Sequence, residues 1–194
     1  MTDAPVDIRD HAAANLRYIR EAMERASSFT IIPGRGIIII GLTALLAARI
    51  AAEQVTPQAW TLVWLVELLV ACVVDVAATV IKARSSRVSL GVPFRRFLVS
   101  FSAPLFAGGL LTVLFYKLAI HDYLPTLWLL LYGTAIVTGG VFSIRIVPAM
   151  GTAFILLGIA SLVIAPAGTN LVMASGFGGL HILFGLIIAW RHGG

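Results

Sequence analysis

The sequence predicts an all-α, polytopic membrane protein with six transmembrane helices and an N-terminal cytoplasmic amphipathic helix. Hydrophobic residues make up 59% of the chain and charged residues only 12%, a balance unlike that of ordinary soluble domains. The apolar runs are too long and too continuous for the alternating strands of a barrel, so helices are the expected spanning element. The basic residues can be placed almost entirely on one side of a six-span arrangement, which favours the same fold.

The six expected spans follow one another with short links, and a helix needs roughly 20 residues to cross the hydrocarbon. Trp60 and Trp128 fall at the expected outer interface and Trp190 at the inner one, where amphipathic rings settle. Residues 1–33 are expected to form a cytoplasmic helix and linker, and residues 34–194 the bundle. The spans are Gly36–Ala52, Trp60–Ile81, Phe97–Leu118, Thr126–Ile146, Pro148–Ala165 and Leu171–Trp190.

The distribution of basic residues predicts the orientation of the chain. Twelve of the 14 Lys and Arg residues fall on one side of the expected arrangement, and only Arg49 and Lys117 fall on the other. Positive charge is retained in the cytoplasm, so both termini are expected there. The first 30 residues contain acids and no apolar h-region, which argues against a secretory signal and a transit peptide. The excess of Arg over Lys, with abundant Ala, is typical of a GC-rich bacterial genome and indicates a bacterial inner membrane.

Residues 7–28 are expected to form a helix outside the membrane, because apolar residues recur there at three- and four-residue steps. Its four arginines are nearly balanced by four acids, so the helix is expected to pack on protein rather than on anionic lipid. The basic segment 82–96, which contains no acid, is expected to be a cytoplasmic loop. The candidate residues for docking a partner are Ile8, Leu16, Ile19 and Met23 in the helix and Arg84, Arg87, Arg95 and Arg96 in the loop.

Two carboxylates fall inside the second expected span, where a charge costs roughly 2.5–3.5 kcal/mol. Glu67 and Asp75 lie on one broad stripe, about 12 Å apart along the helix axis, which is too far for them to share a proton. They could be two stops on a proton or cation path. Alternatively, each is neutral or paired with a basic group from another span.

His181 is expected near the centre of the last span, against another helix, because small residues surround it on the helix wheel. By depth it could form a hydrogen bond with Glu67. It is either a buried neutral histidine with a partner or part of a proton relay. Thr134, Thr138 and Arg145 form a polar stripe on the fourth span; Arg145 could snorkel to the headgroups or reach Asp75.

Glycine doublets recur in mid-span at Gly108-Gly109, Gly139-Gly140 and Gly178-Gly179. Small residues let helices approach closely where the hydrophobic effect cannot drive association. The alternative is that the doublets are flexible points lining a cavity, as in the broken helices of transporters. Small-residue faces also leave contact between identical chains open as a possibility.

The motifs of several function classes are missing from the sequence. No nucleophile elbow, zinc-protease motif, P-loop or dinucleotide fingerprint occurs, so neither an enzyme nor a bound cofactor is expected. No spacing of His, Cys, Asp and Glu supplies three or four metal ligands, and the single Cys72 cannot form an intrachain disulfide. The pI near 10 follows from the cytoplasmic arginines, so nucleic-acid binding is not expected.

The run NLRYIREAMERASSFT, followed by IPGRG and the first expected span, resembles uncharacterised small six-span membrane proteins of bacteria. The resemblance covers the opening 40 residues and the overall length. It implies an architecture and a location, and it carries no activity or functional residue.

Two function classes remain. The first is a non-enzymatic regulatory, accessory or sensor protein whose N-terminal helix and basic loop dock a cytoplasmic protein, with the bundle as anchor or sensor. The alternative is a small proton-coupled or solute transporter whose path is formed by Glu67, Asp75 and His181.

Overall fold

The computed structural model describes residues 15–19, 32–86, 91–163 and 168–192, and the elements that it forms there are helices. Residues 15–19 are a short helical piece of the N-terminal segment. The other helices are α2 (Gly34–Ala51), α3 (Pro57–Ser86), α4 (Val92–Lys117), η1 (His121–Tyr123), α5 (Leu124–Gly140), α6 (Ile146–Ser161), α7 (Thr169–Met173), η3 (Ala174–Leu180) and α8 (His181–His192). The last three run on without a break, and η3 is a π-helix within that long helix.

Four helices are long and apolar enough to cross a membrane: α2, α3, α4 and the continuous helix Thr169–His192. The prediction of an all-helical fold is therefore confirmed for the described residues, and four of its helices are compatible with a membrane protein. A helix also stands at each of the other two expected spans, but α5 has 17 residues and α6 has 16, fewer than in the other four.

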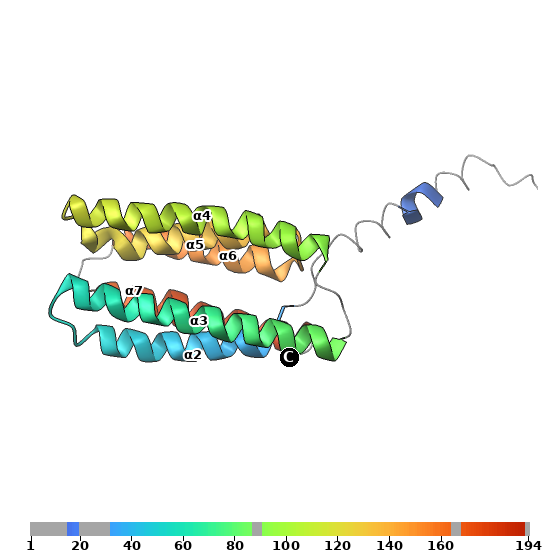
Figure 1. The fold of residues 1–194 in the computed structure, drawn as a ribbon, viewed down its shortest axis with the longest axis horizontal. Helices are drawn as coiled ribbons and strands as arrows, with labels where there is room; N and C mark the ends of the chain where they lie inside the picture. Colours follow the sequence, from blue (N-terminus) through green and yellow to red (C-terminus); the bar gives the residue numbers. More distant parts are fainter. Residues whose placement is uncertain (1–14, 20–31, 87–90, 164–167, 193–194) are drawn as a thin grey trace, which may run out of the picture.

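The helices form two groups of three that lie along a common axis (Figure 1). One group contains α2, α3 and the α7–α8 helix, with α2 packed on both others; the second contains α4, α5 and α6, with α5 packed on both others. The π-helix η3 packs on α2 and on α6, so it joins the two groups. As expected of helices that face lipid, α3 and α4 are mostly exposed within the chain.

Glycines seven residues apart bring two pairs of helices into backbone contact. Gly133 of α5 faces Gly151 of α6: a Cβ on Gly133 would lie 2.7 Å from the carbonyl oxygen of Gly151. In the other pair, a Cβ on Gly41 of α2 would lie 2.8 Å from the carbonyl oxygen of Gly178. A step of seven residues returns to the same helix face, so the glycines form a small-residue seam on each helix. The contacts follow in opposite order along the two helices, so each pair is antiparallel. The seams are Gly34 and Gly41 against Gly178 and Gly185, and Gly133 and Gly140 against Gly151 and Gly158.

The buried side chains form two clusters. The larger lies where α5, α6 and the last helix meet, and Leu129, Phe154 and Ile188 are completely buried in it. The smaller lies between α2, α3 and α7, where small side chains on α2 let Trp64 and Met173 approach; these are Ala44, Ala47, Ala48 and Ala51. The packing interpretation of the small residues therefore accounts for most of the glycines, although a Cβ on Gly109 would meet no atom within 4 Å.

The expected loop 82–96 is mostly helical, so that prediction was wrong. Residues 82–86 continue α3, and residues 92–96 are the first turns of α4, whose second residue Pro93 is compatible with a helix start. At 30 residues α3 is about 45 Å long, which is more than the roughly 30 Å of hydrocarbon that a spanning helix has to cross. The Lys82 ammonium donates to the carbonyl oxygens of Ile32, at 2.7 Å, and His192, at 3.2 Å, which brings three helix ends together.

Candidate functional site

Glu67 joins α3 to α2. Its side chain is buried, and its Oε1 accepts a hydrogen bond from the Thr43 hydroxyl at 2.8 Å. The same hydroxyl also lies 3.0 Å from the carbonyl oxygen of Ile40, one turn back in α2. Glu67 is therefore placed to hold two helices together, and Thr43 is the partner that sequence reasoning missed.

His181 lies at the centre of an aromatic cluster and is 2% exposed. Its Nε2 shares a hydrogen bond of 2.7 Å with the Tyr132 hydroxyl, in which the direction of donation depends on the tautomer. The rings of Tyr132, Phe154 and Phe177 surround the imidazole, with centroids 5.4, 5.3 and 6.2 Å away. The hydrogen bond that was possible between His181 and Glu67 is not formed, because Glu67 bonds to Thr43 of α2 and His181 to Tyr132 of α5.

The π-helix η3 leads directly into His181. Its wider turn includes Gly176, Gly178 and Gly179, and single π turns within α-helices frequently mark functional sites. The carbonyl groups of Gly176 and Phe177 are near enough to act on the imidazole electrostatically. The Nδ1 atom nevertheless forms no hydrogen bond of normal geometry, and it is one of two buried side-chain atoms without one among the described residues; the other is Trp64 Nε1.

Asp75 and Cys72 lie one turn apart on α3 and are both exposed. The sequence left Arg145 either to snorkel or to reach Asp75. Arg145 precedes α6 and is exposed, and no ion pair joins it to Asp75 in the described part of the chain.

The threonines of the predicted stripe on α5 are used in helix packing. Thr134 donates to the carbonyl oxygen of Leu130, one turn back in the same helix, at 2.8 Å. The Thr138 hydroxyl lies 3.1 Å from the carbonyl oxygen of Ser100, in α4, and 2.9 Å from that of Thr134. The stripe therefore supports the contact between α4 and α5. Arg49 forms an ion pair with Glu53 at 2.6 Å.

Several docking candidates are exposed, as docking requires. In the N-terminal segment, Leu16 is 68% exposed and Ile19 52%. The side chains of Arg84, Arg95 and Arg96 are also exposed. Ile8, Met23 and Arg87 lie outside the described residues.

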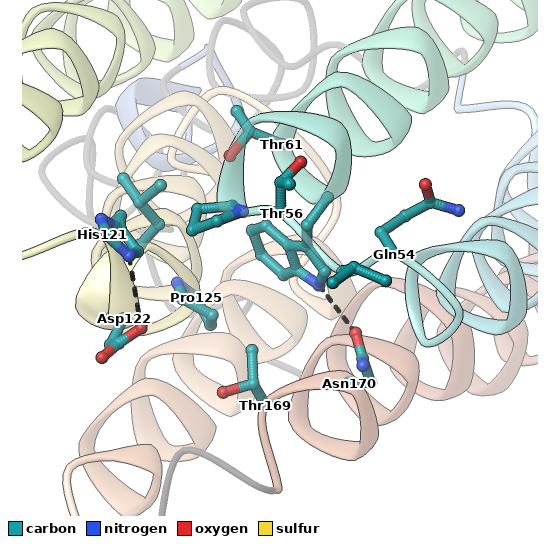
Figure 2. A pocket seen from close by; sticks show the side chains of 12 residues that line it. Gln54, Thr56, Thr61, His121, Asp122, Pro125, Thr169 and Asn170 are labelled. Atoms are coloured by element: carbon teal, nitrogen blue, oxygen red, sulfur yellow. Dashed lines mark hydrogen bonds and ion pairs between the residues drawn. The ribbon is translucent and has the colours of Figure 1, made fainter.

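A pocket of about 210 Å³ is lined by residues from the link between α2 and α3, from η1 and from the start of α7 (Figure 2). Sequence reasoning did not find it. Trp60, predicted as an interface anchor, lines it and donates from Nε1 to Asn170 Oδ1 at 2.8 Å. The polar lining residues from these three places include Gln54, Thr56, His121, Asp122, Thr169 and Asn170.

The described residues contain no group of three or more His, Cys, Asp and Glu side chains that could hold a metal ion. Comparison with protein-family models, curated proteins and solved structures finds no match. Function is therefore inferred from the contacts between side chains.

Proposed function

We propose that the chain is a six-span protein of a bacterial inner membrane, with both termini in the cytoplasm, that serves as a regulatory, accessory or sensor protein. In this proposal it is not an enzyme. The N-terminal helix and the arginines near the ends of α3 and α4 dock a cytoplasmic protein, and the bundle anchors them.

The geometry of α5 and α6 supports six spans. Each is about 25 Å long at ~1.5 Å per residue, slightly less than the hydrocarbon thickness of ~30 Å, and a bilayer thins locally to match such a helix. The two helices pack antiparallel along their glycine seam, and α5 lies against the long helix α4. The Lys82 contacts to Ile32 and His192 support a common side for the first span's start and the last span's end.

The observation that carries the regulatory proposal is that polar groups within the spans form hydrogen bonds between helices. Glu67 bonds to Thr43, His181 bonds to Tyr132, and Thr126 bonds to Ser161 at 2.6 Å, so these groups connect helices. Such bonds stabilise a fixed bundle, as an anchor requires. In contrast, the apolar side chains of Leu16 and Ile19 in the N-terminal segment are exposed. The near balance of positive and negative charges in that segment favours a protein partner over lipid.

Crosslinking in native membranes tests the docking proposal. We expect Leu16→Glu together with Ile19→Glu to remove a crosslinked cytoplasmic protein that the original chain captures, because both changes place charge in the apolar contact. Asn15→Ala, also in the exposed helical piece, should leave the crosslink unchanged. The proposal fails if the crosslinked species is the same for all three proteins, or if none forms.

The transport alternative requires Glu67, Asp75 and His181 to line one path. The hydrogen bonds of Glu67 to Thr43 and of His181 to Tyr132 favour structural roles for both groups instead. We therefore expect proteoliposomes that contain a pH-sensitive dye to show no proton flux above empty liposomes. Flux that Glu67→Gln or Asp75→Asn abolishes would favour a transporter instead.

A further inference from the structure

The pocket lined by Trp60 and Asp122 has walls that other contacts hold in place. The Trp60 ring stacks on Trp128, with centroids 5.7 Å apart and planes 15° apart, and its Nε1 is fixed by Asn170. On the opposite side, His121 stacks on Tyr116 at 6.0 Å, and the Tyr116 hydroxyl donates to the carbonyl oxygen of Pro57 at 2.8 Å. A site whose walls are already ordered loses little entropy when a ligand binds.

The charges around the pocket favour a cation. Asp122 carries the only formal negative charge among the described residues that line the pocket, and none of them is Lys or Arg. The His121 Nε2 atom lies 3.8 Å from Asp122 Oδ1, too far for a hydrogen bond (Figure 2). The Gln54 amide nitrogen donates one of its two hydrogens to the carbonyl oxygen of Ile50, and the amide oxygen can accept a hydrogen bond from a ligand.

The pocket combines an ordered indole, a carboxylate and a small volume. A Trp face attracts ammonium groups through its quadrupole, and this is the usual way in which proteins recognise quaternary ammonium ligands. The volume of about 210 Å³ is below that of most drug-sized sites, so it suits a molecule of a few non-hydrogen atoms. We propose that this pocket binds a small organic ammonium ion, with the cationic group between Trp60 and Asp122. This site does not depend on the docking proposal.

Fluorescence titration of the full chain in maltoside micelles tests the proposal, because Trp60, Trp64 and Trp128 cluster beside the pocket. We expect choline to change the tryptophan emission saturably. The neutral isostere 3,3-dimethylbutan-1-ol should bind much more weakly, since it lacks the charge. Phosphocholine distinguishes the source of the ligand: binding as tight as that of choline indicates a lipid headgroup, and weaker binding, caused by Asp122, indicates a free ammonium ion.

Two exposed carboxylates provide a matched pair of variants. The side chains of Asp122 and Glu53 are 66% and 62% exposed, but only Asp122 lines the pocket. Asp122→Asn should weaken choline binding by about threefold or more, as expected for a partly exposed ion pair, and Glu53→Gln should leave it unchanged. Equal binding of choline and its neutral isostere, equal loss in both variants, or no saturable change would each overturn the proposal.

Discussion

Gly133→Ala is expected to lower the free energy of unfolding by about 1–3 kcal/mol, the range for overpacking a close contact. A Cβ at Gly133 would lie 2.7 Å from the Gly151 carbonyl oxygen and 2.9 Å from the Ile155 nitrogen. Both are backbone atoms of α6, so no side-chain rotation can relieve the clash and the helices must move apart. The intrinsic helix preference for Ala over Gly, up to about 1 kcal/mol, offsets only part of this cost.

Gly109 provides the matched control, because it lies in a neighbouring helix of the same group, and a methyl group added there would meet no atom within 4 Å. Gly109→Ala should be neutral or stabilising by up to about 1 kcal/mol. Unfolding of the purified variants in mixed detergent micelles, followed by circular dichroism, measures the difference. If both substitutions shift the transition equally, the close contact between α5 and α6 does not exist.

The second glycine seam should respond in the same way, since a Cβ on Gly41 would meet the backbone of both Gly178 and Ile182 within 3 Å. The sequence indicated that glycines allow close helix packing, but it did not show which helices the two seams bring together. The glycine doublets were visible in the sequence and indicated close packing. The spacing of seven has meaning only once α2 is known to lie against the last helix and α5 against α6, and that pairing depends on the tertiary structure.

The positions of the helices could be predicted because the apolar runs are long and continuous. The ends of α3 and α4 could not, since the prediction assumed that a basic segment outside the hydrocarbon would form a loop. Ala83 and Arg84 favour helix as much as the residues before them, and charge does not end a helix that is already formed. The charges indicate where the hydrocarbon is expected to end, but the helix continues past that point.

The sequence singled out Glu67 and His181, which are buried, but it did not show which groups they contact. Depth along a span follows from counting residues, and it placed Glu67 and His181 within a turn of each other. Which helices are neighbours does not follow from such a count, and so Thr43 and Tyr132 were not identified as partners. The pocket was missed for a related reason: Gln54, Asp122 and Asn170 come from three segments that are far apart in the sequence.

Tyr132→Phe is expected to destabilise the protein by about 1–3 kcal/mol, because it removes the one hydrogen bond of the buried His181 ring. Both ring nitrogens would then lack a partner of normal geometry in an apolar cluster, and an unsatisfied buried polar group costs more than the bond itself contributed. Tyr123→Phe is the control, since Tyr123 is 56% exposed, and it should change stability by less than about 0.5 kcal/mol.

Substituting His181 as well separates the hydrogen bond from simple packing. In the background of Tyr132→Phe, His181→Phe should recover part of the loss, because an apolar ring of similar size needs no hydrogen-bond partner and retains the contacts with Phe154 and Phe177. The same change alone should destabilise, since it leaves the Tyr132 hydroxyl unpaired. Unfolding free energies of the four proteins in mixed micelles give the coupling between the two positions. Additive effects would mean that Tyr132 and His181 do not share a hydrogen bond, and that the ring contacts alone hold η3 against α5 and α6.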